Sequence, residues 1–253
     1  MTNIMAGHSH WAGIKHKKGK ADKQRSKLFS KLSREITVSA KLGLPEVDFN
    51  PRLRSAVQAA REANMPKDNI VRAIKKAQGP SEDSNYEKSQ YEGFGPGGVA
   101  FIIEALTDNK NRTVTNLRSL FEKNGCSLGV EGSVSYQFDE VGQIKVKKEL
   151  ISEEEIFSQS IEAGAEDCIS GEQYHEVFCK KENFNDVRTS IESKIKDLSF
   201  AGIIWKAKNL VPVNKETFEK IIDFIDLLED DEDVQNVYTN FDVDEKIIKE
   251  MQS

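Results

Sequence analysis

The sequence has few of the residues on which catalysis, metal binding and disulfide bonding depend. Its 253 residues include only three cysteines and four histidines. Cys126, Cys168 and Cys179 are scattered and lack Cys-x-x-Cys spacing, which indicates reduced thiols and neither a disulfide framework nor a zinc site. No Gly-x-Ser-x-Gly or His-Glu-x-x-His motif is present, so the sequence does not support an enzyme, and we expect no cofactor.

Long apolar runs are also missing. No run approaches the ~18–20 residues that a membrane-spanning helix requires, and no apolar segment of a secretory signal follows the start. We therefore expect a cytosolic protein with no membrane partner. Nothing in the sequence indicates a small-molecule substrate.

Acidic residues are scarce in the first third of the chain. Residues 1–79 contain 17 Lys and Arg against 6 Asp and Glu, a net charge of +11, whereas residues 80–253 carry −17. This asymmetry is typical of a polyanion-binding module joined to acidic domains with a different role.

Basic residues are densest in residues 5–34, where Asp22 is the one carboxylate. Residues 6–20 have a glycine every six residues and no apolar period, which predicts a flexible arm. Lysines and arginines suit phosphates, and the rings of Trp11 and the histidines suit stacking on bases. The alternative is a solubilising tail, but the helices that follow are basic as well, so we favour nucleic-acid binding. The candidate binding residues are His8, His10, Trp11, Lys15, His16, Lys17, Lys18, Lys20, Lys23, Arg25, Lys27, Lys31, Arg34, Arg54, Lys67, Arg72, Lys75, Lys76, Lys110 and Arg112.

Two other motifs have weaker interpretations. His8, His10 and His16 could hold a metal ion, but no thiol or carboxylate lies near them in the sequence, and we expect no metal site. The glycine-rich segment 93–98 resembles a phosphate-binding loop only superficially, because it precedes a strand and lacks lysine. We expect it to form tight turns with positive φ.

Three helices are predicted in the basic third of the chain. Apolar periodicity predicts the first from about Asp22 to Lys41, and Asn50-Pro51 is typical of the start of a second. The third is predicted to begin at Asp68 as its cap and to end at Gly79.

The helices are expected to bury separate apolar faces. In the second helix, Leu53 and Val57 are predicted to face inward. In the third, Ile70, Val71 and Ile74 are predicted to do so.

The next segment is expected to be a βαβ unit. Residues 80–92 are polar and indicate a linker, or an edge strand at most. A strand is predicted at residues 99–106, then a helix capped by Asp108 or Asn111, then a strand at residues 134–138. Lys110 and Arg112 are not needed to cap this helix, and their charges suit a second contact with a polyanion.

Residues 142–206 have a clear βαββαβ pattern, the ferredoxin-like arrangement. Ser152 and Glu155 have the spacing of a capping box. The predicted strands and helices are 144–146, 152–163, 166–169, 174–179, 184–195 and 202–206.

A second βαβ unit is predicted at residues 210–238. Because each βαβ unit alone has too small a sheet, we expect the two to pair across the ferredoxin-like insertion. The fold class is then α+β multidomain. The predicted domains are a basic arm and three-helix domain (1–80), a discontinuous α+β domain (81–140 and 207–253) and the inserted domain (141–206).

Five carboxylates follow one another in the acidic turn, Glu229–Asp233. They lack the ligand spacing of a Ca²⁺ loop, so we expect a solvated turn. The alternative is a patch that binds a basic partner.

Several long segments resemble the YebC/PmpR family over residues 5–240. They are MAGHSHWAGIKHKKGKADKQRSKLFSKLSREI, NMPKDNIVRAIKKAQG, YEGFGPGGVAFIIEALTDNKNRT, KNGCSLGVEGSVSYQF, EAGAEDC and LEDDEDVQNVYTN. His10 stands where the family usually has Lys, and Gly13 where it often has Asn. The resemblance implies three domains, the third inserted into the second.

The resemblance also implies a function. Bacterial members are described as cytoplasmic, DNA-binding transcriptional regulators, so we expect a non-enzymatic regulator of this kind. The family also includes a mitochondrial translational activator and bacterial members linked to ribosome function at proline-rich stretches. The alternative is therefore a translation factor that binds rRNA or tRNA on the ribosome, and a flexible Lys/Gly arm slightly favours RNA.

Overall fold

The computed structural model describes residues 21–78 and 86–252, and it has a mixed α+β, multidomain fold, which confirms the predicted fold class. The described chain divides into two compact units. The first contains residues 21–31, 86–139 and 207–252, and the second contains residues 32–78 and 140–206.

Three helices open the described chain: α2 (Ala21–Leu42), α3 (Pro51–Glu62) and α4 (Lys67–Ala77). Asn50 caps α3, because its side-chain oxygen accepts a hydrogen bond from the N–H of Leu53 at 3.0 Å. Leu53 and Val57 are buried, as predicted.

Two predictions for α4 are wrong. The N-cap is Pro66, and Asp68 lies inside the first turn, where its charge faces the positive end of the helix dipole. Val71 is 39% exposed, because Ile70 and Ala73 occupy the buried face of the helix.

The first unit is built on a four-stranded antiparallel sheet with the order β3-β1-β2-β9. The strands are β3 (Ser127–Leu128), β1 (Glu87–Phe94), β2 (Ala100–Thr107) and β9 (Val234–Thr239). The pairing of β2 with β9 joins segments on either side of the insertion, as expected. Gly97 and Gly98, in the turn between β1 and β2, have φ of 70° and 74°, as the glycine-rich segment predicts.

Of the two predictions for residues 80–92, the described residues support the edge strand and not the linker, because β1 begins at Glu87. Most of β1 pairs with β2 on one side alone, since β3 is two residues long, and its exposed face tolerates polar side chains.

The predicted strand at residues 134–138 is also wrong: a 3₁₀ turn, Ser135–Gln137, occupies it. The carboxylate of Glu92 accepts hydrogen bonds from the backbone N–H groups of Gly132, Val134 and Ser135, so these donors are not available to a strand ladder.

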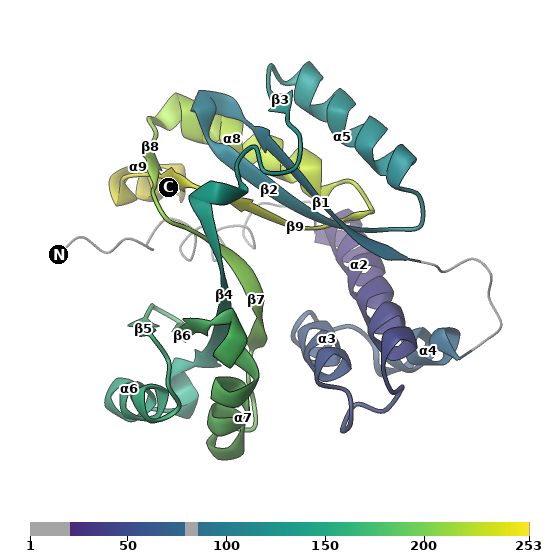
Figure 1. The fold of residues 1–253 in the computed structure, drawn as a ribbon, viewed down its shortest axis with the longest axis vertical. Helices are drawn as coiled ribbons and strands as arrows, with labels where there is room; N and C mark the ends of the chain where they lie inside the picture. Colours follow the sequence, from purple (N-terminus) through teal and green to yellow (C-terminus); the bar gives the residue numbers. More distant parts are fainter. Residues whose placement is uncertain (1–20, 79–85, 253) are drawn as a thin grey trace. The chain divides into compact units, whose positions relative to one another are not determined.

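Helices α5 (Lys110–Lys123) and α8 (Lys215–Glu229) pack on one face of this sheet (Figure 1). The centre of the core is a group of three rings, Phe101, Phe121 and Phe224, in edge-to-face contacts with centroids 4.9–6.5 Å apart. Such pairs contribute about 0.5–1.5 kcal/mol beyond the burial of their area.

The second unit contains the predicted βαββαβ fold. Its elements are β4 (Phe138–Lys147), α6 (Glu153–Glu162), β5 (Asp167–Ser170), β6 (Tyr174–Lys180), α7 (Phe184–Lys194) and β7 (Phe200–Ala207). The sheet order β5-β6-β4-β7 is that of a ferredoxin-like fold. The capping box of Ser152 and Glu155 is confirmed.

Short elements complete the fold. The strand predicted at residues 210–213 is β8 (Val211–Pro212), and it pairs in parallel with β10 (Phe241–Asp242) rather than joining the main sheet. The others are α9 (Glu245–Gln252), η2 (Pro96–Gly98), η4 (Lys148–Leu150) and η5 (Lys181–Asn183).

Candidate nucleic-acid interface

Helix α4 presents a cationic face. Its cations Lys67, Arg72, Lys75 and Lys76 are all exposed, opposite the buried Ile70 and Ala73. Lys67 and Lys75 lie two turns apart, and Arg72 and Lys76 lie one turn apart beside them. Among the described residues, no carboxylate forms an ion pair with any of these four cations. Their charge is therefore available to an external polyanion.

Two of the predicted cations outside α4, Arg54 and Lys110, make ion pairs within the fold. Arg54 donates to a Glu192 carboxylate oxygen at 2.9 Å and to the Asp48 carbonyl at 2.7 Å. Lys110 lies 2.6 Å from a carboxylate oxygen of Glu87. Each of these side chains is partly exposed, so its ion pair is weak by itself.

Arg112 is the most constrained of the predicted cations. It donates to Asp108 at 2.7 Å and to Asp233 at 2.9 Å. Hydrogen bonds from Asp233 and Asp108 raise the pKa of Arg112 above its already high value. Neither predicted residue caps α5: Asn109 does, accepting from the N–H of Arg112 at 3.0 Å, and Asp108 instead holds the guanidinium.

The acidic turn is open to solvent at Asp230 and Glu232, as predicted, but it is buried at Asp233. Asp233 is 3% exposed, with Arg112 and the hydroxyls of Thr107 and Thr113 around its carboxylate. Asp233 departs from the expected solvated turn because a buried carboxylate surrounded by hydrogen-bond donors can replace hydration by protein contacts. Asp230, by contrast, is exposed.

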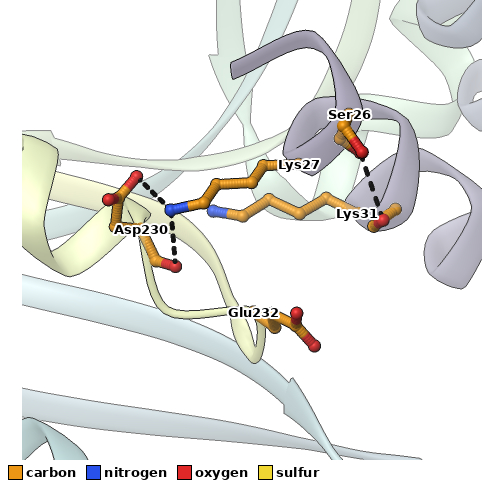
Figure 2. A pocket seen from close by; sticks show the side chains of 6 residues that line it. Ser26, Lys27, Lys31, Asp230 and Glu232 are labelled. Carbon is orange, nitrogen blue, oxygen red and sulfur yellow. Dashed lines mark hydrogen bonds and ion pairs between the residues drawn. The ribbon is translucent and has the colours of Figure 1, made fainter. Parts of the chain in front are cut away.

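Part of α2 contacts the acidic turn (Figure 2). The Lys27 ammonium lies 2.7 Å from a carboxylate oxygen of Asp230, and the Lys31 ammonium donates to the carbonyl of Glu229 at 2.7 Å. Arg25 is exposed, and Arg34 is half-buried with interactions of its own.

Most of the predicted arm residues lie outside the described part of the chain. His8, His10, Trp11, Lys15, His16, Lys17, Lys18 and Lys20 lie outside the described residues, and so does the side chain of Lys23. Arg61 is absent from the predicted set but is exposed in the last turn of α3. The density of charge around it in the sequence was the signal that could have included it.

The histidine and the cysteine of β6 have structural surroundings rather than catalytic ones. His175 is fully buried, with its ring nitrogens 2.7 Å from the Ser170 hydroxyl and 3.1 Å from the Ile151 carbonyl. Burial raises the pKa of the Cys179 thiol to about 11, so it is protonated near neutral pH. Across the described part of the chain, no cluster of three or more His, Cys, Asp or Glu residues could hold a metal ion.

No helix among residues 21–78 and 86–252 has both the length and the apolar character needed to cross a membrane.

Comparisons with known proteins agree with the resemblance in the sequence. Residues 9–80 match the model of the TACO1/YebC protein N-terminal domain, and residues 86–241 match that of the TACO1/YebC second and third domain. A probable transcriptional regulatory protein of Pelagibacter ubique is 54% identical over 236 residues, which are 93% of this chain and 98% of that protein. The crystal structure of a conserved hypothetical protein from Aquifex aeolicus has 46% identity and a TM-score of 0.80, covering 93% of this chain and 97% of that one. The chain belongs to the TACO1/YebC family.

Proposed function

We propose that this protein is a non-enzymatic, cytoplasmic regulator of gene expression, and that it acts as a DNA-binding transcriptional regulator. Nucleic acid binds to the arm (residues 6–20), to the basic start of α2 and to the exposed face of α4. The name of the Pelagibacter relative supports regulation of transcription.

The observation that carries this proposal is the set of exposed cations on α4. Lys67, Arg72, Lys75 and Lys76 project from one short helix and have no ion-pair partner among the described residues. Cations concentrated on a surface repel one another and contribute nothing to the core, so a polyanion is the partner that makes them favourable. Their contacts are with phosphates, which provide affinity but little sequence preference.

The test is a salt titration of binding to duplex DNA carrying a promoter. Replacing Lys67, Arg72, Lys75 and Lys76 by Gln removes up to four phosphate contacts. The slope of log K against log salt should then fall by up to about 3.6. The matched control replaces four exposed lysines elsewhere, Lys88, Lys123, Lys148 and Lys196, by Gln. It makes the same change in net charge and should leave the slope nearly unchanged.

The same titration is carried out with ribosomes and with an rRNA hairpin. Ribosome binding at physiological salt, together with weak and sequence-independent DNA binding, would replace the transcriptional role by a role in translation. Equal effects of the two quadruple variants would remove α4 from the interface. Absence of binding to all of these nucleic acids would overturn the proposal.

A further inference from the structure

The end of α8 has an unfavourable charge distribution. The helix ends at Glu229 with Asp230 as its C-cap, and no basic residue lies in its last turn. Negative side chains at this end repel the negative pole of the helix dipole, which is unfavourable. Lysine or arginine at this end of a helix is favourable instead. In this protein the missing cations come from another helix, far away in the sequence.

Those cations are Lys27 and Lys31 of α2, one helical turn apart (Figure 2). The Lys27 ammonium contacts both the carboxylate and the carbonyl of Asp230, at 2.7 and 3.5 Å. The Lys31 ammonium contacts the Glu229 carbonyl at 2.7 Å. The two lysines therefore bind an array of oxygens at the end of α8.

The same face of α2 has the composition of a phosphate-binding surface. Ser26 and Ser30 alternate with Lys27 and Lys31, and these four residues line a small cleft of about 80 Å³ whose other wall is Asp230 and Glu232. Ammonium and hydroxyl groups spaced by one turn suit the oxygens of a phosphodiester backbone. In the folded protein, oxygens of the acidic turn occupy the ammonium groups of Lys27 and Lys31.

We propose that the acidic turn is an intramolecular competitor of nucleic acid for Lys27 and Lys31, and so lowers the affinity of the protein for polyanions. This inference rests on the proposed function, because it concerns the basic start of α2. The contact inhibits binding until a phosphate backbone displaces it.

The energetics suit a reversible contact. The side chains of Lys27 and Asp230 are 28% and 58% exposed, and ion pairs this accessible contribute little to stability. The other end of the turn is fixed, because Asp233 is buried and bonded to Arg112. The turn therefore remains a preformed competitor when the lysines leave it.

The test is a double variant of the turn, Asp230→Asn with Glu232→Gln, in the full-length protein. Without these charges Lys27 is released, so affinity for duplex DNA should rise by about two- to fivefold at fixed salt. The salt slope should steepen by about 0.9 for each lysine that gains a phosphate. The matched control is Glu219→Gln with Asp223→Asn, which removes two exposed charges of α8. Within the described part of the chain, neither residue forms a hydrogen bond or an ion pair with α2. It should change affinity much less.

A second comparison separates competition from general electrostatics. Lys27→Gln with Lys31→Gln should abolish the gain in affinity that neutralising the turn produces, so the effects of the two double variants are not additive. An equal gain with the control variant, or a gain that persists without the lysines, would overturn the inference.

Heparin serves as a polyanion that does not depend on the proposed function. The turn variant should elute from a heparin column at higher salt than the wild type and the control. If it does so while no nucleic acid is bound, the proposed function fails and the competition stands. Unchanged elution together with unchanged nucleic-acid affinity would mean that the turn does not compete.

Discussion

The guanidinium of Arg112 binds both carboxylate oxygens of Asp233, with its Nη2 atom 2.9 and 3.1 Å from them. The hydroxyls of Thr107 and Thr113 lie 3.1 and 2.8 Å from one of these oxygens. The carboxylate is thus held near the start of α5, where the helix dipole favours a negative charge. This contact joins the acidic turn to the end of β2 and the start of α5.

Replacing Asp233 by Ala should therefore destabilise the first unit. The change leaves the buried hydroxyls of Thr107 and Thr113 without this acceptor and removes one of the two carboxylate partners of Arg112. We expect a loss of about 2–4 kcal/mol in the free energy of unfolding. Urea denaturation followed by circular dichroism measures it. Asp223→Asn, an exposed change on α8, is the control and should stay within about 0.5 kcal/mol of the wild type.

The same carboxylate makes stability depend on pH. Burial alone raises the pKa of Asp233, but hydrogen bonds from Arg112 and Thr113 outweigh it, and the net pKa lies below its usual value. A carboxyl group with a depressed pKa stabilises the fold above its unfolded pKa of about 4, and this contribution is lost as pH falls through the folded-state pKa. The free energy of unfolding, measured with urea at neutral and at acidic pH, should fall less on acidification for Asp233→Asn than for the wild type. Parallel pH profiles for the two proteins would contradict this assignment.

Glu92 should control the shape of the loop before β4. It is 2% exposed and accepts three backbone N–H groups, from Gly132, Val134 and Ser135, at 2.8–3.0 Å. Burial raises the pKa of Glu92, but the backbone hydrogen bonds together lower it by more than burial raises it. The carboxyl group is therefore charged at neutral pH.

Glu92→Gln places an amide donor against backbone donors and should cost about 1–3 kcal/mol. Hydrogen exchange at Val134 and Ser135 should accelerate more than exchange in the sheet of the second unit, for example at Val177. Uniform acceleration across both units would show that the effect is not local.

The arm should contribute to the salt dependence of binding. Replacing Lys15, Lys17, Lys18 and Lys20 by Ala should lower the slope of log K against log salt by up to about 3.6 for duplex DNA. Binding of the variant and the wild type is compared by fluorescence anisotropy over a salt series. A slope that does not change would mean that these lysines form only a solubilising tail.

Local sequence patterns predicted many elements well because their signals lie within a few residues. The capping box of Ser152 and Glu155 is satisfied inside one helical turn, and Asn50 before Pro51 is likewise a local start signal. The apolar face of α8 and the βαββαβ order of elements along the chain also follow from periodicity. For α5, the helix was predicted but its cap was not, since three neighbouring polar residues were all suitable caps and Asn109 has that role.

The sequence by itself determined the family, the α+β class and the concentration of positive charge in the first third of the chain. Only the tertiary structure decided how individual charges are used. Lys27 and Arg112 have carboxylate partners more than a hundred residues away, whereas the cations of α4 have none among the described residues. The periodicity of the sequence indicates which side of a helix or strand is apolar. It does not indicate ion pairs between segments far apart in the sequence, because these depend on how the segments pack in the folded protein. The polar sequence of β1 left a linker and an edge strand both open for the same reason, because its strand conformation comes from pairing with β2 and not from its own side chains.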